Sequence, residues 1–209
     1  VMNAILRGVA SATLALALSL AGPAAAQTPP NVLVVGQIAE PASLDPHVST
    51  AANDFRIHVN IYDGLVRNKP GTLEIEPALA TDWTISEDGL TYTFKLRPGV
   101  KFHNGEDFTA EDVVFSFSRN RLSGPQAILP EGPRFWGTLD RVEVIDPYKV
   151  RIVSKVPDVM LEQRLAGYAS WIVNAKEYLT VGKDAFARKP AGTGPYKIDE
   201  WKDGDYIRL

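Results

Sequence analysis

The chain has 209 residues, no cysteine, 45% apolar residues and a formal net charge of −3. These values exclude a small disulfide-stapled protein and a thiolate zinc site, and they argue against a nucleic-acid binder that relies on a basic surface. The length allows one domain or two, each large enough to bury a hydrophobic core.

The first 26 residues have the pattern of a secretory signal peptide. Arg7 supplies a positive charge, and residues 9–21 form an apolar stretch. Gly22-Pro23 breaks this stretch just before three alanines that end at Ala26, where we expect cleavage. The stretch is too short for a membrane-spanning helix, which takes about 20 residues, and the alternative is a buried core helix. Because no cysteine follows, we expect an exported protein without a lipid anchor.

The first elements of the mature chain are predicted to be a strand and a helix. Residues 32–38 form a short apolar run that is typical of a buried strand. Ser49 or Thr50 is suited to cap a helix that Gly64 ends or disturbs. Its predicted buried face comprises four residues at near-helical spacing: Phe55, Val59, Tyr62 and Val66.

Strands and then a second helix are predicted next. Residues 90–96 alternate between apolar and polar side chains, which indicates a strand with one buried face. A helix is predicted to begin at Thr109, because its hydroxyl can cap the first turn while Asp112 reaches back from three residues later. The apolar side of this helix extends to Leu122. Its last residues include two that favour the negative end of a helix, Arg119 and Arg121.

The rest of the chain is predicted to mix short helices and strands. Residues 124–137, rich in Gly and Pro, are expected to form a loop. The later elements are expected in this order: a hairpin of residues 139–145 and 149–153, helices at 159–165 and 175–179, and strands at 196–201 and 206–209. The sequence ends within this last alternating strand, so we expect the 209 residues alone to expose an unpaired strand edge and to fold poorly.

Patterns of catalytic or metal-binding residues are missing from the sequence. Neither G-x-S-x-G nor H-E-x-x-H occurs. The histidines, His47, His58 and His103, are separated by 11 and 45 residues, which matches no metal-ligand spacing and favours ordinary surface or hydrogen-bonded histidines. Gly192-Thr193-Gly194 resembles the start of a phosphate-binding loop, but Pro195 follows it, and we interpret it as a turn. These patterns alone indicate a secreted α/β protein.

Five blocks of the sequence, taken together, carry a family resemblance. They are Ser43-Leu44-Asp45-Pro46-His47, Tyr62-Asp63-Gly64-Leu65-Val66, the long block from Pro77-Ala78-Leu79 through Asp88-Gly89-Leu90-Thr91-Tyr92 to Thr109-Ala110-Glu111-Asp112, Thr193-Gly194-Pro195-Tyr196, and Trp201-Lys202-Asp203-Gly204-Asp205. In order and spacing they closely resemble the family 5 solute-binding proteins, the extracytoplasmic receptors of ABC importers for oligopeptides, dipeptides and nickel.

The resemblance implies a fold and a domain organisation. The fold would be α/β, of the type II periplasmic-binding-protein kind, with a discontinuous first lobe. Residues 27–62 and 191–209 would belong to that lobe, and residues 63–190 would form an inserted additional α/β domain. Family members are more than twice as long as this chain, so the second lobe is expected to be missing from these 209 residues.

The resemblance also implies candidate ligand-binding residues. An edge that pairs with the backbone of an extended peptide would lie at Thr50, Ala51, Ala52 and Asn53. These side chains are small and uncharged, so they offer no carboxylate to a peptide amino group. The alternative role of Thr50 is that of a helix cap. Phe135-Trp136, in a loop that the family directs toward the cleft, are further candidates.

The implied function is that of a periplasmic, non-enzymatic receptor. It would capture a small solute, most simply an oligopeptide or dipeptide, by lobe closure and deliver it to the membrane subunits of an ABC importer. It would act as a monomer, without cofactor or metal and without nucleic acid. The alternatives are a receptor for a nickel chelate or an oligosaccharide on the same fold and, in another class, a secreted hydrolase.

Overall fold

We obtained a computed structural model of the chain that describes residues 28–124 and 127–209. The predicted signal segment, residues 1–26, lies outside the described residues. The elements in chain order are α2 (Ala52–Ile61), β1 (Val66–Asn68), β2 (Ile75–Pro77), β3 (Ala80–Ile85), β4 (Thr91–Leu96), α3 (Ala110–Ser116), the π-helix η1 (Arg119–Ser123), α4 (Gly132–Trp136), β5 (Leu139–Asp146), β6 (Lys149–Ser154), α5 (Leu161–Leu165), α6 (Ala175–Val181), α7 (Lys183–Phe186), β7 (Glu200–Lys202) and β8 (Tyr206–Arg208). All of them belong to the compact unit formed by residues 38–209.

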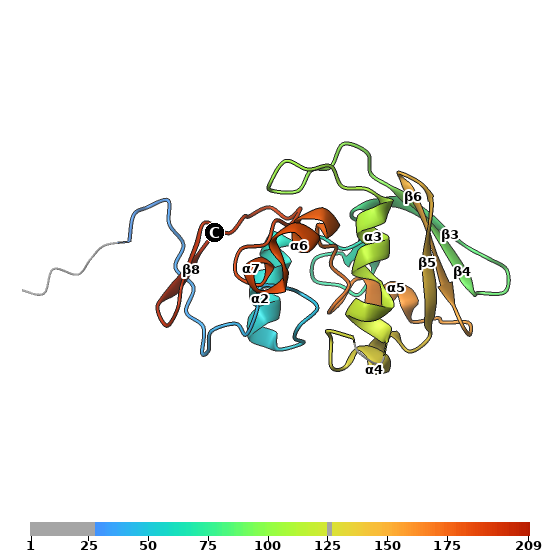
Figure 1. Cartoon of the computed structure of the whole chain (residues 1–209), viewed down its shortest axis with the longest axis horizontal. Coiled ribbons are helices and arrows are strands. Elements are labelled where there is room, and N and C mark those ends of the chain that lie inside the picture. The colour runs from blue at the N-terminus through green and yellow to red at the C-terminus, as the bar shows by residue number, and fades with distance from the viewer. Residues whose placement is uncertain (1–27, 125–126) are drawn as a thin grey trace, which may run out of the picture. The chain divides into compact units, whose positions relative to one another are not determined.

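The main sheet is antiparallel, with the strand order β3-β4-β6-β5, and α3 packs against β5 and β6 (Figure 1). On the central strand β4, Tyr92 and Phe94 are buried while Lys95 is exposed, so the predicted alternation is confirmed. Tyr92 lies opposite Ile152 of β6 and Phe94 opposite Val150. The hairpin of β5 and β6 is also confirmed, and it supplies the other half of the apolar face.

The N-terminus of α3 is confirmed at Thr109, but its C-terminus is not where the sequence predicted it. The Thr109 N–H donates to the Asp112 carboxylate at 2.9 Å. The helix ends at Ser116 because Ser118 has an extended backbone, with φ −63° and ψ 154°. The chain then re-enters helical geometry as η1, from which Leu122 reaches the core.

The beginning and the buried face of α2 also differ from the prediction. Its N-cap is Ala51, which makes no side-chain capping bond, so the assignment of the cap to Ser49 or Thr50 is wrong. The inner face carries Asp54, Ile57, His58 and Ile61, whereas Val59 is 41% exposed. A search for apolar residues at helical spacing could not identify this face, because two of its four residues are polar. These polar residues form hydrogen bonds in the interior.

Residues 32–38 do not form the predicted strand. They have no regular secondary structure, and Leu33 and Ile38 are 87% and 93% exposed. A strand needs a partner strand for its backbone hydrogen bonds, which the apolar pattern of the run does not itself supply. The Val32 N–H instead donates to the Pro29 carbonyl within a turn, at 3.0 Å. The predicted loop 124–137 is corrected as well, because it contains α4.

Buried apolar residues form two clusters. The larger lies between the main sheet and α3 and includes Phe94, Phe108 and Trp136. The smaller joins α2 to the later part of the chain through Ile61, Trp171, Phe186 and Ile198. Trp171 and Phe186 therefore pack with the smaller cluster although they precede position 191, where the sequence suggested the return to the first lobe. The domain boundaries remain a prediction.

The turn at residues 192–194 packs directly on the end of α2. The Gly194 N–H donates to the Ile61 carbonyl at 3.1 Å, and the Tyr196 N–H donates to the Asn60 carbonyl at 2.9 Å. His103 lies on the other side, where its N–H donates to the Gly192 carbonyl at 2.9 Å. A Cβ on Gly192 would stand 1.6 Å from the Ile61 carbonyl oxygen, so only glycine fits this close approach.

Candidate ligand-binding site

The first group of predicted ligand residues, 50–53, lies at the beginning of α2. Ala51 and Ala52 are exposed, and Thr50 and Asn53 are half-buried. The first N–H groups of a helix have no acceptor within it. In keeping with this, the N–H groups of Ala52 and Asn53 have no acceptor among the described residues. This end of α2 therefore offers backbone donors next to small side chains that leave room for a ligand.

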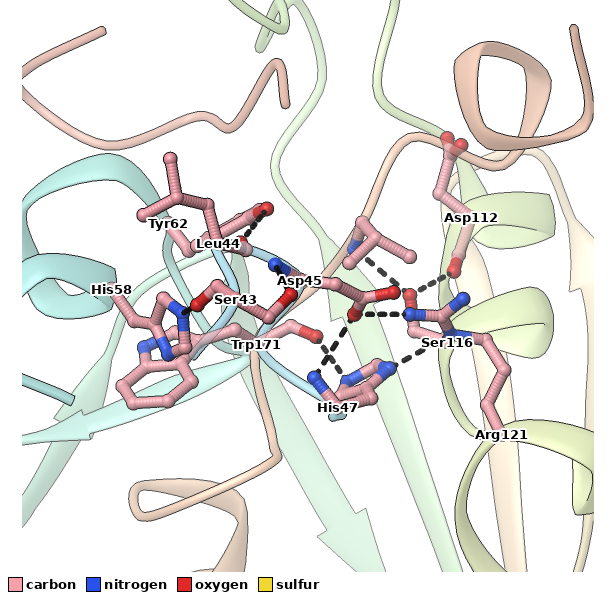
Figure 2. Close-up of polar contacts among 11 residues, drawn as sticks. Ser43, Leu44, Asp45, His47, His58, Tyr62, Asp112, Ser116, Arg121 and Trp171 are labelled. Carbon is pink, nitrogen blue, oxygen red and sulfur yellow. Dashed lines mark hydrogen bonds and ion pairs between the residues drawn. The ribbon is translucent and has the colours of Figure 1, made fainter. Parts of the chain in front are cut away.

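A buried polar network lies directly before this segment (Figure 2). Nη2 of Arg121 donates to Oδ1 of Asp45 at 2.6 Å, and Nε of Arg121 donates to Nδ1 of His47 at 2.8 Å. Both side chains of the ion pair are only 2% exposed. This Asp45–His47–Arg121 network fastens the loop that leads into α2 to η1, more than seventy residues further along the chain.

The hydrogen bonds determine the protonation state of His47. Because a guanidinium group can only donate, Nδ1 of His47 is the acceptor and the proton lies on Nε2. Nε2 then donates to the Trp171 carbonyl at 3.1 Å. Burial, and after it the charge of Arg121, lower the pKa of His47 well below its ordinary value of 6.5. His47 is thus a neutral hydrogen-bonded residue at pH 7, as the sequence predicted.

The same loop is also tied to the inner face of α2. The Tyr62 hydroxyl donates to the Leu44 carbonyl at 2.9 Å, and Nε2 of His58 donates to the Ser43 carbonyl at 3.0 Å (Figure 2). Burial raises the pKa of Tyr62 well above its ordinary value and lowers that of His58. These hydrogen bonds fix residues 43–47, and with them the segment that leads into residues 50–53.

The environment of Arg121 differs from the predicted one, in which it complements the negative end of the helix that begins at Thr109, because α3 ends at Ser116 and Arg121 is buried in η1. Its guanidinium carbon lies 4.4 Å from the centre of the Tyr178 ring and 5.1 Å from that of Phe115. Aromatic faces attract a desolvated cation, so these rings add to the stability of the ion pair. Arg119, two residues earlier, is exposed. No local pattern distinguishes the two arginines, because only the break at Ser118 turns Arg121 inward.

Phe135 and Trp136, the second group of predicted ligand residues, lie in the wall of a hollow. Trp136 is 1% exposed and packs edge-on against Phe117 at 5.2 Å, whereas Phe135 is half-buried. A hollow of about 210 Å³ is lined by Phe135, Trp136, Gln163, Arg164, Gly167 and Tyr168. Most of its wall is aromatic or aliphatic, which suits an apolar group of a ligand.

Tyr168 connects this hollow to the first group. Its ring lies 4.4 Å from that of Phe55, which is on the second turn of α2, and Phe55 in turn lies 5.2 Å from Trp171. Tyr168 itself is 41% exposed. The contact between Phe55 and Tyr168 thus brings residues 50–53 close to the hollow that Phe135 lines. Because these two aromatic residues are 113 positions apart, the spacing of residues in the sequence could not reveal the contact.

A second hollow, of about 420 Å³, is polar. It is lined by residues of the β4–α3 connection and of the start of α6, among them Glu106, Asp112 and Asn174. These groups bind one another: Asn174 donates to Glu106 at 2.8 Å, and Asp112 accepts the Ala175 N–H at 3.0 Å. Within residues 28–124 and 127–209, no three acidic or histidine side chains are arranged to hold a metal ion. These contacts fasten α6 to α3.

Comparison with known proteins identifies the class. Residues 74–209 match the model of the bacterial extracellular solute-binding proteins, family 5. The chain therefore belongs to this family, and its mixed α/β fold is that of type II periplasmic binding proteins, as predicted. No helix in the part of the chain that the structure describes is both long and apolar enough to cross a membrane.

Individual relatives show which ligands accompany this fold. The chain is 34% identical to di/tripeptide-binding protein 2 of Pseudomonas aeruginosa (strain UCBPP-PA14), over 92% of this chain and 40% of that protein. It is similar to the periplasmic binding protein DppA of Helicobacter pylori in complex with the peptide STSA (35% identity, TM-score 0.72, 81% of this chain and 36% of that one). It is also similar to NikZ of Campylobacter jejuni in complex with Ni(L-His) (28%, TM-score 0.65, 81% and 33%). The chain spans about 40% of the length of its curated relatives.

Proposed function

We propose that the chain is part of a periplasmic receptor that captures short peptides for an ABC importer. The observation that carries the proposal is the exposed start of α2, where the N–H groups of Ala52 and Asn53 have no acceptor among the described residues and the side chains are small. An extended peptide presents carbonyl groups to such donors, so it is bound through its backbone. The similarity to proteins named for dipeptides and tripeptides supports this ligand class.

Binding would use both groups of the candidate site. Residues 50–53 would pair with the peptide backbone, while the hollow beside Phe135 and Trp136 would take an apolar side chain of the peptide. Closure of a second lobe over the ligand would exclude water and create the form that the importer's membrane subunits recognise. The receptor would act as a monomer and would catalyse no reaction, and so would need no cofactor.

Export and domain organisation complete the proposal. The segment before Gln27 would direct export and be removed, leaving the protein free in the periplasm. The smaller apolar cluster, around Ile61 and Ile198, would be the core of the first lobe, and the larger one that of the inserted domain. A receptor for a nickel chelate is the second candidate, because the structure of NikZ holds nickel on the same fold.

The ligand class can be tested by thermal unfolding of the complete protein with a panel of ligands. We expect dipeptides, tripeptides or tetrapeptides to raise the melting temperature, since a ligand at one hundred times its Kd adds about 2.7 kcal/mol to the free energy of unfolding. A panel in which peptides have no effect while nickel–histidine or an oligosaccharide raises the melting temperature would contradict the proposal.

Two matched variants connect this effect to the site. Ala51→Trp fills an exposed position on the proposed edge and is expected to abolish the shift caused by peptide. Leu73→Trp enlarges a side chain that is 84% exposed in the loop between β1 and β2, and is expected to retain the shift. If both variants respond to peptide as the unchanged protein does, residues 50–53 do not bind the ligand.

A further inference from the structure

The Asp45–His47–Arg121 network joins two segments that no other side-chain ion pair in the described residues connects. One is the loop that leads into residues 50–53, and the other is η1. The carboxylate of Asp45 already accepts from Arg121 and from the backbone N–H of His47, both through Oδ1. The attachment of the loop to η1 therefore depends on one guanidinium group and on the unprotonated Nδ1 that it contacts.

A proton on Nδ1 of His47 is incompatible with this arrangement. It would place an N–H group against the N–H of Arg121, where the two nitrogens now lie 2.8 Å apart, and it would put two cations in a site from which water is excluded. The titratable groups that face His47 are Arg121 from η1, His58 from α2 and Asp45 from its own loop. Asp45 is the one carboxylate among these groups, and its Oδ1 already accepts from Arg121 and from the N–H of His47.

We propose that the contact of His47 with Arg121 is an acid-sensitive latch: it holds residues 50–53 in place at neutral pH, and protonation of His47 releases them and weakens ligand binding. This inference rests on the proposed function, because it takes residues 50–53 to bind the ligand. An exported receptor is exposed to the pH of its surroundings. The latch would therefore lower the affinity of the receptor for its ligand when these surroundings are acidic.

The direction of the effect follows from linkage. The folded environment lowers the pKa of His47 below its ordinary value of 6.5, to which a released, hydrated ring returns. The released form therefore takes up a proton more readily as the pH falls below about 6.5. At pH 5.0 the ratio of released to latched molecules rises about thirtyfold over its value at pH 7.5. Above pH 7.5 the latch is insensitive to pH, because His47 is neutral in both forms.

The test measures the affinity of the complete protein for trialanine at pH 7.5 and 5.0 by calorimetry, together with the ¹⁵N resonances of the histidine rings. The key variant is His47→Asn, whose amide oxygen can accept from Arg121 but takes up no proton. The matched control is His58→Gln, which removes the neighbouring buried histidine. Its amide group can still donate to the Ser43 carbonyl, and it does not touch the contact of His47 with Arg121. We expect the affinity of the unchanged protein and of His58→Gln to fall at least threefold at pH 5.0, and that of His47→Asn to stay within twofold.

Equal pH dependence in the unchanged protein and in His47→Asn would overturn the latch, and so would a pH dependence that only His58→Gln removes. The ¹⁵N resonances of the histidine rings report the protonation state of His47 whether or not a ligand binds. If neither trialanine nor any other peptide of the panel binds, the proposed ligand class fails, whereas the latch still predicts an unprotonated Nδ1 of His47 at pH 7.5. The latch also predicts greater amide hydrogen exchange in residues 42–53 for Arg121→Gln than for Arg119→Gln at that pH. A protonated Nδ1, or equal exchange in the two variants, would contradict it.

Discussion

Replacing Arg121 with methionine is expected to lower the melting temperature of the protein by roughly 6–20 °C. The substitution keeps most of the side-chain volume but leaves the Asp45 carboxylate buried without its cation, and it removes the donor to Nδ1 of His47. Breaking a buried ion pair by removing one partner costs about 3–5 kcal/mol, which corresponds to a shift of this size for a domain of about 200 residues. Circular dichroism during heating measures it.

The matched control is Arg119→Met, two residues away on the same π-helix but exposed, which is expected to change the melting temperature by less than about 2 °C. The double variant Asp45→Leu/Arg121→Met should lose less stability than Arg121→Met alone, because it leaves no unpaired charge. A melting temperature for Arg121→Met as high as that of Arg119→Met would show that the ion pair does not hold the loop.

The second large effect is expected from Gly192→Ala. Its Cβ would lie 1.6 Å from the Ile61 carbonyl oxygen, and this obstacle is backbone that cannot rotate away. The turn at residues 192–194 would have to leave α2 and lose its hydrogen bonds with His103. Overpacking of this kind costs about 3 kcal/mol or more, so the melting temperature should fall by roughly 6 °C at least.

Gly36→Ala serves as the control, because no atom lies within 4 Å of its added Cβ and its backbone is not in the left-handed region. It is expected to melt within about 2 °C of the unchanged protein. If Gly192→Ala does the same, the close approach of residues 192–194 to α2 is not a feature of the folded protein.

The elements that the sequence predicted correctly are those whose local pattern agrees with their packing. The strand around Phe94 alternates because one face lies on the core, and α3 begins at Thr109 because the capping bonds are local. Residues 32–38 show the opposite case. Their apolar pattern is that of a buried strand, but they have no regular secondary structure, because a strand depends on a partner that a local pattern does not supply.

The contacts that position the candidate site could not be predicted from the spacing of residues in the sequence. The sequence could not show that residues 50–53 and Phe135 lie near each other, and the structure places Phe55 and Tyr168 between them. The burial of Arg121 results from the extended backbone of Ser118, and its partner Asp45 lies 76 residues earlier. Such long-range pairs leave no periodic signal. A buried polar network is also invisible to a search for apolar faces, which is why the inner face of α2 was misplaced.

The most direct test of the central claim is a crystal structure of the complete protein with a bound short peptide. We predict that the peptide lies along the start of α2, with its carbonyl groups accepting from the N–H groups of Ala52 or Asn53 and a side chain in the hollow beside Phe135. A peptide bound elsewhere, without contact to residues 50–53, would contradict the account.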